Sequence, residues 1–220
     1  MKKAIDFINA HFDFKFYGVS WISMFVFVLV ILAYTLGLPQ EYGYENGVIE
    51  NMQMVVLFVI MYLCFTSKCN KPFFNFIALA LTLLIIREVN CGRTLFFPIP
   101  DQPHHYYSWR DLPWKWLGKI VHTVYSLYIA FVGLVFLKKK FYVDMWNLVK
   151  NIKLPVWQLC FMFVAMFMGA IAEKATNNNF VFEEGFEFLF YVTIGGIVWL
   201  YSRNRNFMLN NAVDNDVVEQ

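Results

Sequence analysis

The chain has 220 residues, of which 59% are hydrophobic and 15% are charged, and its mean hydropathy is +0.49. This composition is too apolar for an ordinary soluble domain and predicts an integral membrane protein. A formal net charge of +2 gives no reason to expect a nucleic acid partner, and the length fits a single domain.

Six apolar segments of about 20 residues follow one another along the chain, and each is long enough to cross the hydrocarbon core as a helix. They cover residues 18–38, 46–66, 73–92, 118–137, 154–174 and 182–201. The sequence therefore predicts an all-α integral membrane protein, a six-transmembrane-helix bundle over residues 18–201. Residues 1–17 are expected to form a cytoplasmic, amphipathic lead-in at the membrane interface, and residues 202–220 a disordered cytoplasmic tail.

Lysine and arginine predict the orientation of the bundle, because cytoplasmic loops carry an excess of both residues. Most of them fall at the two ends of the chain and in the second and fourth loops: Lys2, Lys3, Lys15, Lys68, Lys71, Lys138, Lys139, Lys140, Lys150, Lys153, Arg203 and Arg205. With six spans, all of these positions lie on one side. We therefore expect both termini in the cytoplasm and a bacterial cytoplasmic (inner) membrane as the host.

The longest outer segment, residues 93–117, is rich in aromatic and basic residues. Trp109, Trp114 and Trp116 alternate there with Arg110 and Lys115, a mixture typical of chain that lies among lipid headgroups. Three uses remain open for this loop: a lid over a site, a device that draws lipid headgroups toward it, or an aromatic belt without further role.

Ionisable residues converge at one depth near the outer ends of the predicted helices. With about 1.5 Å of rise per residue, five of them sit about one turn inside the outer boundary, and Glu173 closes its helix at that level. The five are Glu50, Arg87, Glu88, His122 and Glu187. The inner halves of the predicted helices are almost uncharged, so the charged groups predict a site at the outer end.

Helix capping explains only part of this pattern. Carboxylates in N-terminal turns are favoured by free backbone N–H groups and by the helix dipole, which accounts for Glu45 and Glu183. The same dipole disfavours Glu88 and Glu173, which end their helices. Those two acids need cations at the same depth, so the sequence predicts a buried ion-pair network.

The candidate residues divide into two groups by their expected roles. Gln53 shares a helix face with Glu50, and Glu184 lies within reach of Glu187; the arginines suit phosphate or carboxylate oxygens. The candidate catalytic residues are Glu50, Arg87, Glu88, His122, Glu173 and Glu187, and the candidate substrate-binding residues are Arg93, Gln53 and Glu184. Glu and His together would also suit a divalent metal, although neither an HExxH nor a Glu-x-x-His pattern is present.

Three functions are compatible with such a site. The first is an enzyme at the outer leaflet, acting on a lipid headgroup or a lipid-linked substrate, with membrane lipids as its partners. The second is a proton- or cation-coupled transporter or channel, which would be expected to place its site nearer the bilayer midplane. The third is a structural subunit of a membrane complex, whose ion pairs only hold helices together. We expect the first.

Overall fold

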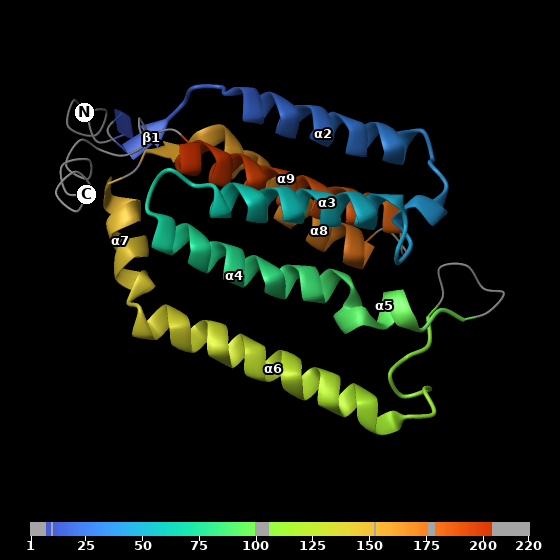
Figure 1. The fold of residues 1–220 in the computed structure, drawn as a ribbon. Coiled ribbons are helices and arrows are strands. Elements are labelled where there is room, and N and C mark those ends of the chain that lie inside the picture. The colour runs from blue at the N-terminus through green and yellow to red at the C-terminus, as the bar shows by residue number, and fades with distance from the viewer. Residues whose placement is uncertain (1–7, 10, 100–105, 152, 176–178, 204–220) are drawn as a thin grey trace.

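A computed structural model gives the fold of residues 8–9, 11–99, 106–151, 153–175 and 179–203, and only these residues are described. The long helices are α2 (Gly18–Thr35), α3 (Val48–Phe65), α4 (Lys71–Glu88), α6 (Lys115–Lys138), α8 (Val156–Ala175) and α9 (Phe180–Arg203) (Figure 1). The short elements are β1 (Phe12–Asp13), η1 (Gln40–Gly43), η2 (Asn90–Gly92), α5 (Arg93–Phe96), α7 (Phe141–Asn151) and β2 (Leu154–Pro155).

The predicted all-helical membrane fold is confirmed at the level of helix length and composition. Among the described residues, four segments are long and apolar enough to cross a membrane: Gly18–Thr35, Gln40–Phe65, Lys115–Lys138 and Phe180–Arg203. Lys71–Glu88 and Asn90–Phe96 add a fifth if this bent pair is counted as one span, and Val156–Ala172 is a shorter apolar helix. The chain is thus a multi-pass membrane protein by these criteria.

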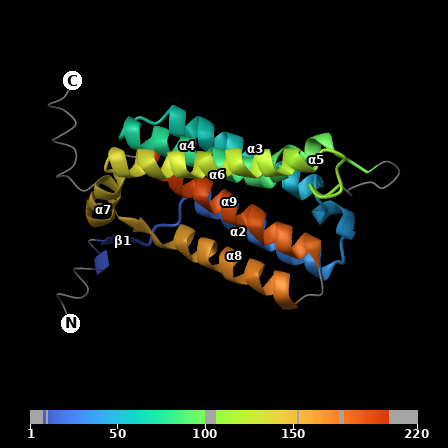
Figure 2. The same cartoon turned by 90° about the horizontal axis from the view of Figure 1, so that it is seen from below.

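Helix α9 forms the centre of the bundle. It packs against α2, α3 and α8, and Figure 2 shows α2, α8 and α9 on one side with α3, α4 and α6 on the other. Phe186 and Leu189 of α9 are fully buried with α2 and α8, whereas Tyr191 and Val198 are buried with α3 and α4. A helix that is apolar on all sides is expected to occupy such a central place.

Two glycines of α9 allow its neighbours to approach closely. A Cβ atom on Gly185 would lie 2.9 Å from Cγ1 of Val30 in α2, and one on Gly196 would lie 2.5 Å from Nε2 of Gln158 in α8. Small residues at helix contacts let backbones pack tightly in membranes. Gln158 also accepts a hydrogen bond of 3.0 Å from Ser23 Oγ, so a buried polar contact joins α2 and α8 beside α9.

Helix α4 ends in a sharp bend. Asn90, Cys91 and Gly92 all have positive φ values, and the axis of the following residues 90–96 is turned by 54° from that of α4. Positive φ is uncommon for residues other than glycine. The predicted span 73–92 therefore stops at Glu88, and the bend carries Arg93 away from the axis of α4.

Helices α6 and α7 lie at the edge of the bundle. Tyr125 and Tyr128 of α6 donate hydrogen bonds to backbone carbonyls of α4, at 3.3 Å and 3.2 Å. Most of α6 is otherwise exposed, including Leu127 and Leu134, which fits contact with lipid. Helix α7, which the sequence reasoning treated as loop, crosses the end of the bundle after α6 (Figure 1).

The described ends of the chain meet at one end of the bundle. Strand β1 pairs in parallel with β2, with Phe12 opposite Leu154. The hydroxyl of Tyr201 in α9 donates to the carbonyl of Lys153, at 3.0 Å. Of the lead-in predicted over residues 1–17, residues 1–7 and 10 lie outside the described part; Ile8, Asn9 and His11 are helical, whereas Phe12–Asp13 is a strand and residues 14–17 have no regular structure. The tail is described only for Ser202 and Arg203, which continue α9.

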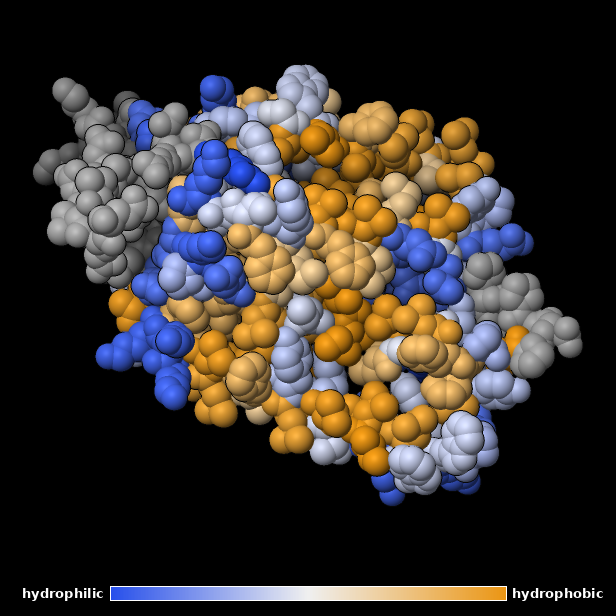
Figure 3. All heavy atoms as spheres, viewed as in Figure 1, coloured by the Kyte–Doolittle hydropathy of each residue, from blue (hydrophilic) through white to orange (hydrophobic). Residues whose placement is uncertain are grey.

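The surface shows the polarity expected of a membrane protein. Figure 3 shows apolar side chains over the middle of the visible face and hydrophilic side chains gathered toward its two ends. Exposed Trp114 and Trp116 lie near the start of α6, while exposed Trp21 and Trp146 lie near the opposite end. Tryptophan is enriched at both membrane interfaces.

Candidate functional site

Four carboxylates gather where α3 and α9 begin and α4 ends. We call Glu50, Glu88, Glu184 and Glu187 the acidic cluster. Glu50 lies within electrostatic range of Glu88 and Glu187, and Glu184 within range of the other three. The alternating directions of α3, α4 and α9 bring these residues to the same end of the bundle. The structure thus brings together four of the predicted site residues from three helices.

Arg87 is the cation of the acidic cluster. Its Nη2 atom lies 3.2 Å from Oε1 of Glu187, and its Nη1 atom lies 3.8 Å from Oε1 of Glu88. The Arg87 side chain is 58% exposed, whereas that of Glu88 is 7% exposed. The guanidinium group therefore reaches the carboxylates from the rim and keeps donors free for another anion.

Glu88 is held by a tyrosine that the sequence reasoning missed. The hydroxyl of Tyr191 donates a hydrogen bond of 2.6 Å to Oε1 of Glu88, and both side chains are buried. Tyr191 lies one helical turn after Glu187, so the two side chains share one face of α9. This spacing is the signal that could have identified it.

Gln53 joins α3 to α9 within the cluster. Its Nε2 atom donates to Oε2 of Glu184 at 2.8 Å and to the Glu184 carbonyl at 3.0 Å. The Gln53 side chain is fully buried, and its Oε1 atom has no hydrogen-bond partner among the described residues. A buried acceptor without a donor is costly to the folded state.

Glu50 also has a local role. Its Oε2 atom accepts a hydrogen bond from the backbone N–H of Asn46, just before α3 begins. Capping therefore explains Glu50 better than the sequence reasoning allowed, because the carboxylate satisfies a backbone donor at the start of its own helix. Glu50 also lies within electrostatic range of Glu88 and Glu187, so it still belongs to the acidic cluster.

Two hollows open beside the acidic cluster. One has a volume of about 260 Å³, and its lining includes Arg87, Glu187 and Tyr191 together with Gly169 of α8. The other has a volume of about 500 Å³ and is lined in part by Glu45, Glu183 and Glu184. Of the acidic cluster, Glu187 and Glu184 are thus open to a ligand, whereas Glu50 and Glu88 line neither hollow.

Arg93 pairs outside the cluster. Its Nη2 atom lies 2.6 Å and 2.9 Å from the two carboxylate oxygens of Glu45, which also accepts a 3.3 Å hydrogen bond from Nδ2 of Asn90. The bend after α4 places Arg93 here. Glu45 lines the 500 Å³ hollow beside the acidic cluster, whereas its partner Arg93 lines a third hollow. The ion pair therefore lies between these two hollows.

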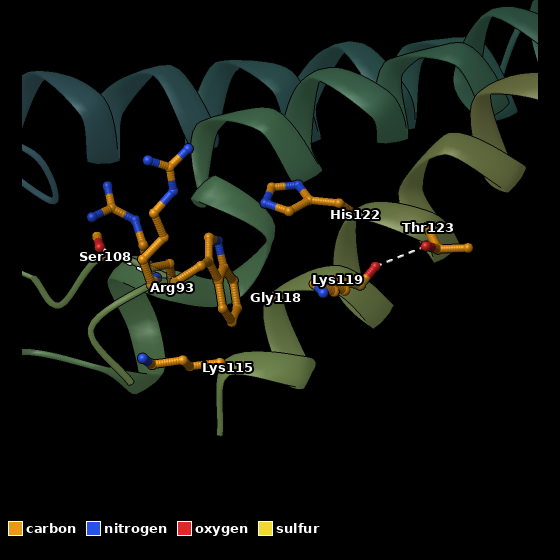
Figure 4. Close-up of a pocket in the computed structure, with 9 residues that line it drawn as sticks. Arg93, Ser108, Lys115, Gly118, Lys119, His122 and Thr123 are labelled. Carbon is orange, nitrogen blue, oxygen red and sulfur yellow. Dashed lines mark hydrogen bonds between the residues drawn. The ribbon is translucent and has the colours of Figure 1, made fainter. Parts of the chain in front are cut away.

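The third hollow is basic and contains His122. Its volume is about 1110 Å³, and Figure 4 shows Arg93 on one side and Lys115, Lys119 and His122 along α6 on the other. The rings of His122 and Trp109 lie 6.2 Å apart. Among the described residues, no hydrogen bond or ion pair joins His122 to a carboxylate. His122 shares the depth of the acidic cluster, but it lines a different hollow.

Two further expectations from the sequence concern Glu173 and a metal. Glu173 belongs to the last turn of α8, but its side chain lies outside the described part of the structure. Within the described ranges, no group of three or more His, Cys, Asp or Glu side chains has an arrangement that could hold a metal ion.

Comparison with known proteins gives no further guide: no family model matches the chain, and neither the curated proteins nor the solved structures contain a significant match.

Proposed function

We propose that the chain crosses a bacterial inner membrane six times, through α2, α3, α4, α6, α8 and α9, with both ends in the cytoplasm. The support is that the six apolar segments of the sequence coincide with these helices to within a few residues. The lysines that predict the cytoplasmic side, such as Lys68 and Lys138, lie at the ends of α3 and α6 that are remote from the acidic cluster.

In this orientation the acidic cluster faces the outer leaflet, and we infer that it belongs to an enzyme acting on a lipid headgroup or a lipid-linked substrate. The observation that carries this proposal is the imbalance of charge. Among the described residues, Arg87 is the one cation paired with these four carboxylates, and it reaches Glu88 and Glu187 only, while Arg93 is engaged by Glu45. A network that only held helices together would match each of these carboxylates with a cation, since a charge removed from water without a partner is destabilising.

The roles follow from exposure and hydrogen bonding. Glu187 lines the 260 Å³ hollow, so it is the general acid or base that meets the substrate. Arg87 lines the same hollow and binds the substrate's anionic group through its exposed guanidinium. Glu88 and Tyr191 position these two groups through their buried hydrogen bond.

A proton- or cation-coupled carrier is the alternative, and the helices beyond the cluster argue against it. Residues 51–65 of α3, 72–86 of α4 and 188–202 of α9 include no Asp, Glu, Lys or Arg. Carriers hold their ions near the bilayer midplane, usually where helices are broken. The bend in this chain follows α4 at the end of the bundle, so it supplies no midplane site.

The test is an untargeted conversion assay. Purified protein is reconstituted into nanodiscs with a total bacterial lipid extract, and lipid species are followed over time by mass spectrometry. Wild-type protein should convert one lipid class, and Glu187→Gln should slow this conversion about 10²- to 10⁴-fold. Glu41→Gln, the same change at an exposed glutamate of η1, should leave the rate unchanged. Equal conversion by wild type and Glu187→Gln, or none by wild type, would contradict the proposal.

A further inference from the structure

The 260 Å³ hollow beside the acidic cluster lies between α4 and α8, and α9 forms its floor. Arg87 comes from the last turn of α4, Gly169 from α8 and Glu187 from α9. Helix α8 packs against α2 and α9, whereas α4 packs against α3 and α6. Figure 2 shows α9 between α8 and the layer that holds α4 and α6. The hollow therefore borders the side of the bundle, where lipid surrounds a membrane protein.

Exposed residues in its wall indicate that the hollow opens sideways. Met166 of α8 lines it and is 54% exposed, and Ala170, one turn later, lines it and is exposed too. Met166 lies nine residues before Ala175, the last residue of α8, and thus about 14 Å from the end of the helix. In the six-span orientation, an exposed residue at this depth faces the hydrocarbon of the outer leaflet.

The wall changes from charged to apolar with depth. Glu183 lies near the start of α9 and Arg87 near the end of α4, both at the outer end of the hollow. Phe190 of α9 and Ala165 of α8 line it farther from the outer ends of their helices. From Glu183 to Phe190 the hollow follows α9 for about 10 Å, which is less than the half-thickness of the hydrocarbon core, about 15 Å. This order matches a lipid with its headgroup outward and its chain below.

The charges at the outer end define the headgroup that fits. The exposed guanidinium of Arg87 keeps donors free for an anionic group. Glu183 and Glu187 line the same space, and their carboxylates accept hydrogen bonds but repel an anion that has no donors of its own. A headgroup that combines an anionic group with hydroxyl groups satisfies both kinds of residue.

We propose that this hollow is the side entrance of the site, and that it binds an anionic lipid of the outer leaflet whose headgroup also carries hydroxyl groups. The anionic group binds Arg87, and the hydroxyl groups donate to Glu183 and Glu187. The first part of one chain lies against Met166 and Phe190. A volume of about 260 Å³ is slightly below the usual range of ligand pockets, about 300–1,000 Å³, so the rest of the lipid remains in the bilayer.

This inference deepens the proposed function by naming the lipid class and its path, and it rests on that function for the orientation of the bundle. Binding requires no turnover, so the two can fail separately. If the chain binds the lipid as expected but converts none, the proposed enzyme is wrong and the binding site stands. If it converts a lipid but the hollow has no part in binding, this inference alone is wrong.

The experiment measures binding of dioleoyl phosphatidylglycerol to the full chain in detergent by native mass spectrometry. The wild type should bind one molecule. Gly169→Phe places a ring in the hollow and should weaken binding at least about tenfold. Gly169→Ala, whose Cβ atom would make an ordinary 3.8 Å contact with Phe186, should change it less than about twofold. The matched control is Gly133→Phe in α6, where no atom lies within 4 Å of the new Cβ atom, and it should also have less than about a twofold effect.

Substitutions of charged residues test the headgroup contacts. Arg87→Gln should weaken binding at least about tenfold, because charge-assisted hydrogen bonds to the anionic group are lost. Lys119→Gln removes the same charge from the 1110 Å³ hollow and should change binding less than about twofold. Glu187→Gln should bind the lipid at least as tightly as the wild type, because glutamine still accepts a hydrogen bond and no longer repels the anion.

Three probes separate the parts of the lipid. Dioleoylglycerol lacks the anionic group and should bind at least about tenfold more weakly than phosphatidylglycerol. Glycerol phosphate lacks the chains and should also bind at least about tenfold more weakly. Dioleoyl phosphatidylmethanol keeps the charge and the chains but lacks the hydroxyl groups, and it should bind at least about threefold more weakly.

Four results would overturn the inference. Equal binding by Gly169→Phe and Gly133→Phe would place the lipid on another surface. Equal binding of dioleoylglycerol would remove the role of the anionic group, and equal binding of phosphatidylmethanol would remove that of the hydroxyl groups. Glycerol phosphate bound as tightly as phosphatidylglycerol would make the hollow a site for a water-soluble anion. Retained thermal stability of each variant shows that the chain is folded.

Discussion

The hydrogen bond between Tyr191 and Glu88 is the contact of the acidic cluster whose strength can be estimated most directly. Tyr191→Phe removes only the hydroxyl, which donates to the buried Glu88 carboxylate at 2.6 Å. A hydrogen bond to a charged group contributes about 1.5–3 kcal/mol. The remaining partner, Arg87, lies 3.8 Å away with a side chain that is 58% exposed, so that ion pair compensates for less than about 1 kcal/mol.

We therefore expect Tyr191→Phe to lower the free energy of unfolding by about 1.5–3 kcal/mol. For a chain of this size, that corresponds to a fall in melting temperature of about 3–12 °C. Thermal unfolding in detergent, followed by circular dichroism, measures it. Tyr62→Phe is the matched control, because the Tyr62 side chain is 64% exposed, and it should change the free energy by less than about 0.5 kcal/mol.

The same substitution in a Glu88→Leu variant tests whether the Tyr191 hydroxyl acts through Glu88. In the Glu88→Leu variant the acceptor is gone and the Tyr191 hydroxyl is buried without its partner. Tyr191→Phe should then be neutral or stabilising, because it removes an unsatisfied polar group. If Tyr191→Phe cost the same stability in the wild type and in the Glu88→Leu variant, the hydroxyl would not act through this carboxylate.

Three other predictions concern a helix contact, an ion pair and a tyrosine just before α2. Gly185→Ala forces a Cβ atom against Val30 of α2 and should lower the free energy of unfolding by about 1–3 kcal/mol, measured by thermal unfolding. The control is Gly133→Ala in α6, where no atom lies within 4 Å of the new Cβ atom; it should be neutral or raise the free energy of unfolding by up to about 1 kcal/mol. Glu45→Gln removes the charge that pairs with Arg93 and, because the Glu45 side chain is 43% exposed, should lower the free energy of unfolding by no more than about 1 kcal/mol, whereas a loss of several kcal/mol would contradict this reading of the pair. Burial and a neighbouring aspartate raise the pKa of Tyr17 to about 12. Since the folded state holds the Tyr17 proton more tightly than the unfolded state, the stabilisation from this group is present below about pH 10 and is lost as the pH rises toward 12. An ultraviolet titration in which Tyr17→Phe removes no transition near pH 12 would refute this pKa.

Much of the fold could be predicted from the sequence because long apolar segments have few alternatives in a membrane. The segment expected at 182–201 is α9, Phe180–Arg203, and the segment expected at 118–137 is α6, Lys115–Lys138. The bend after Glu88 was missed, since it depends on positive φ at Asn90 and Cys91, and neither residue by itself predicts this conformation.

The candidate site was only partly predictable for a geometric reason. The sequence indicates how deep a residue lies along its helix, but it says much less about the neighbours that the helix will have. Depth was sufficient for Arg87, Glu88 and Glu187, whose helices α4 and α9 both pack against α3. It was insufficient for His122, because α6 lies at the edge and turns this residue into the 1110 Å³ hollow. Tyr191 was missed because attention to charged residues passed over a neutral hydrogen-bond donor.

The central claim is that the acidic cluster performs acid–base chemistry on a lipid at the outer end of the bundle. The most direct measurement compares the lipids that co-purify with the wild-type protein and with Glu187→Gln, by quantitative mass spectrometry. A blocked enzyme retains its substrate, so Glu187→Gln should carry about one equivalent of an anionic lipid that is depleted from the wild type, and Glu41→Gln should resemble the wild type. Identical lipids on all three proteins would contradict the account.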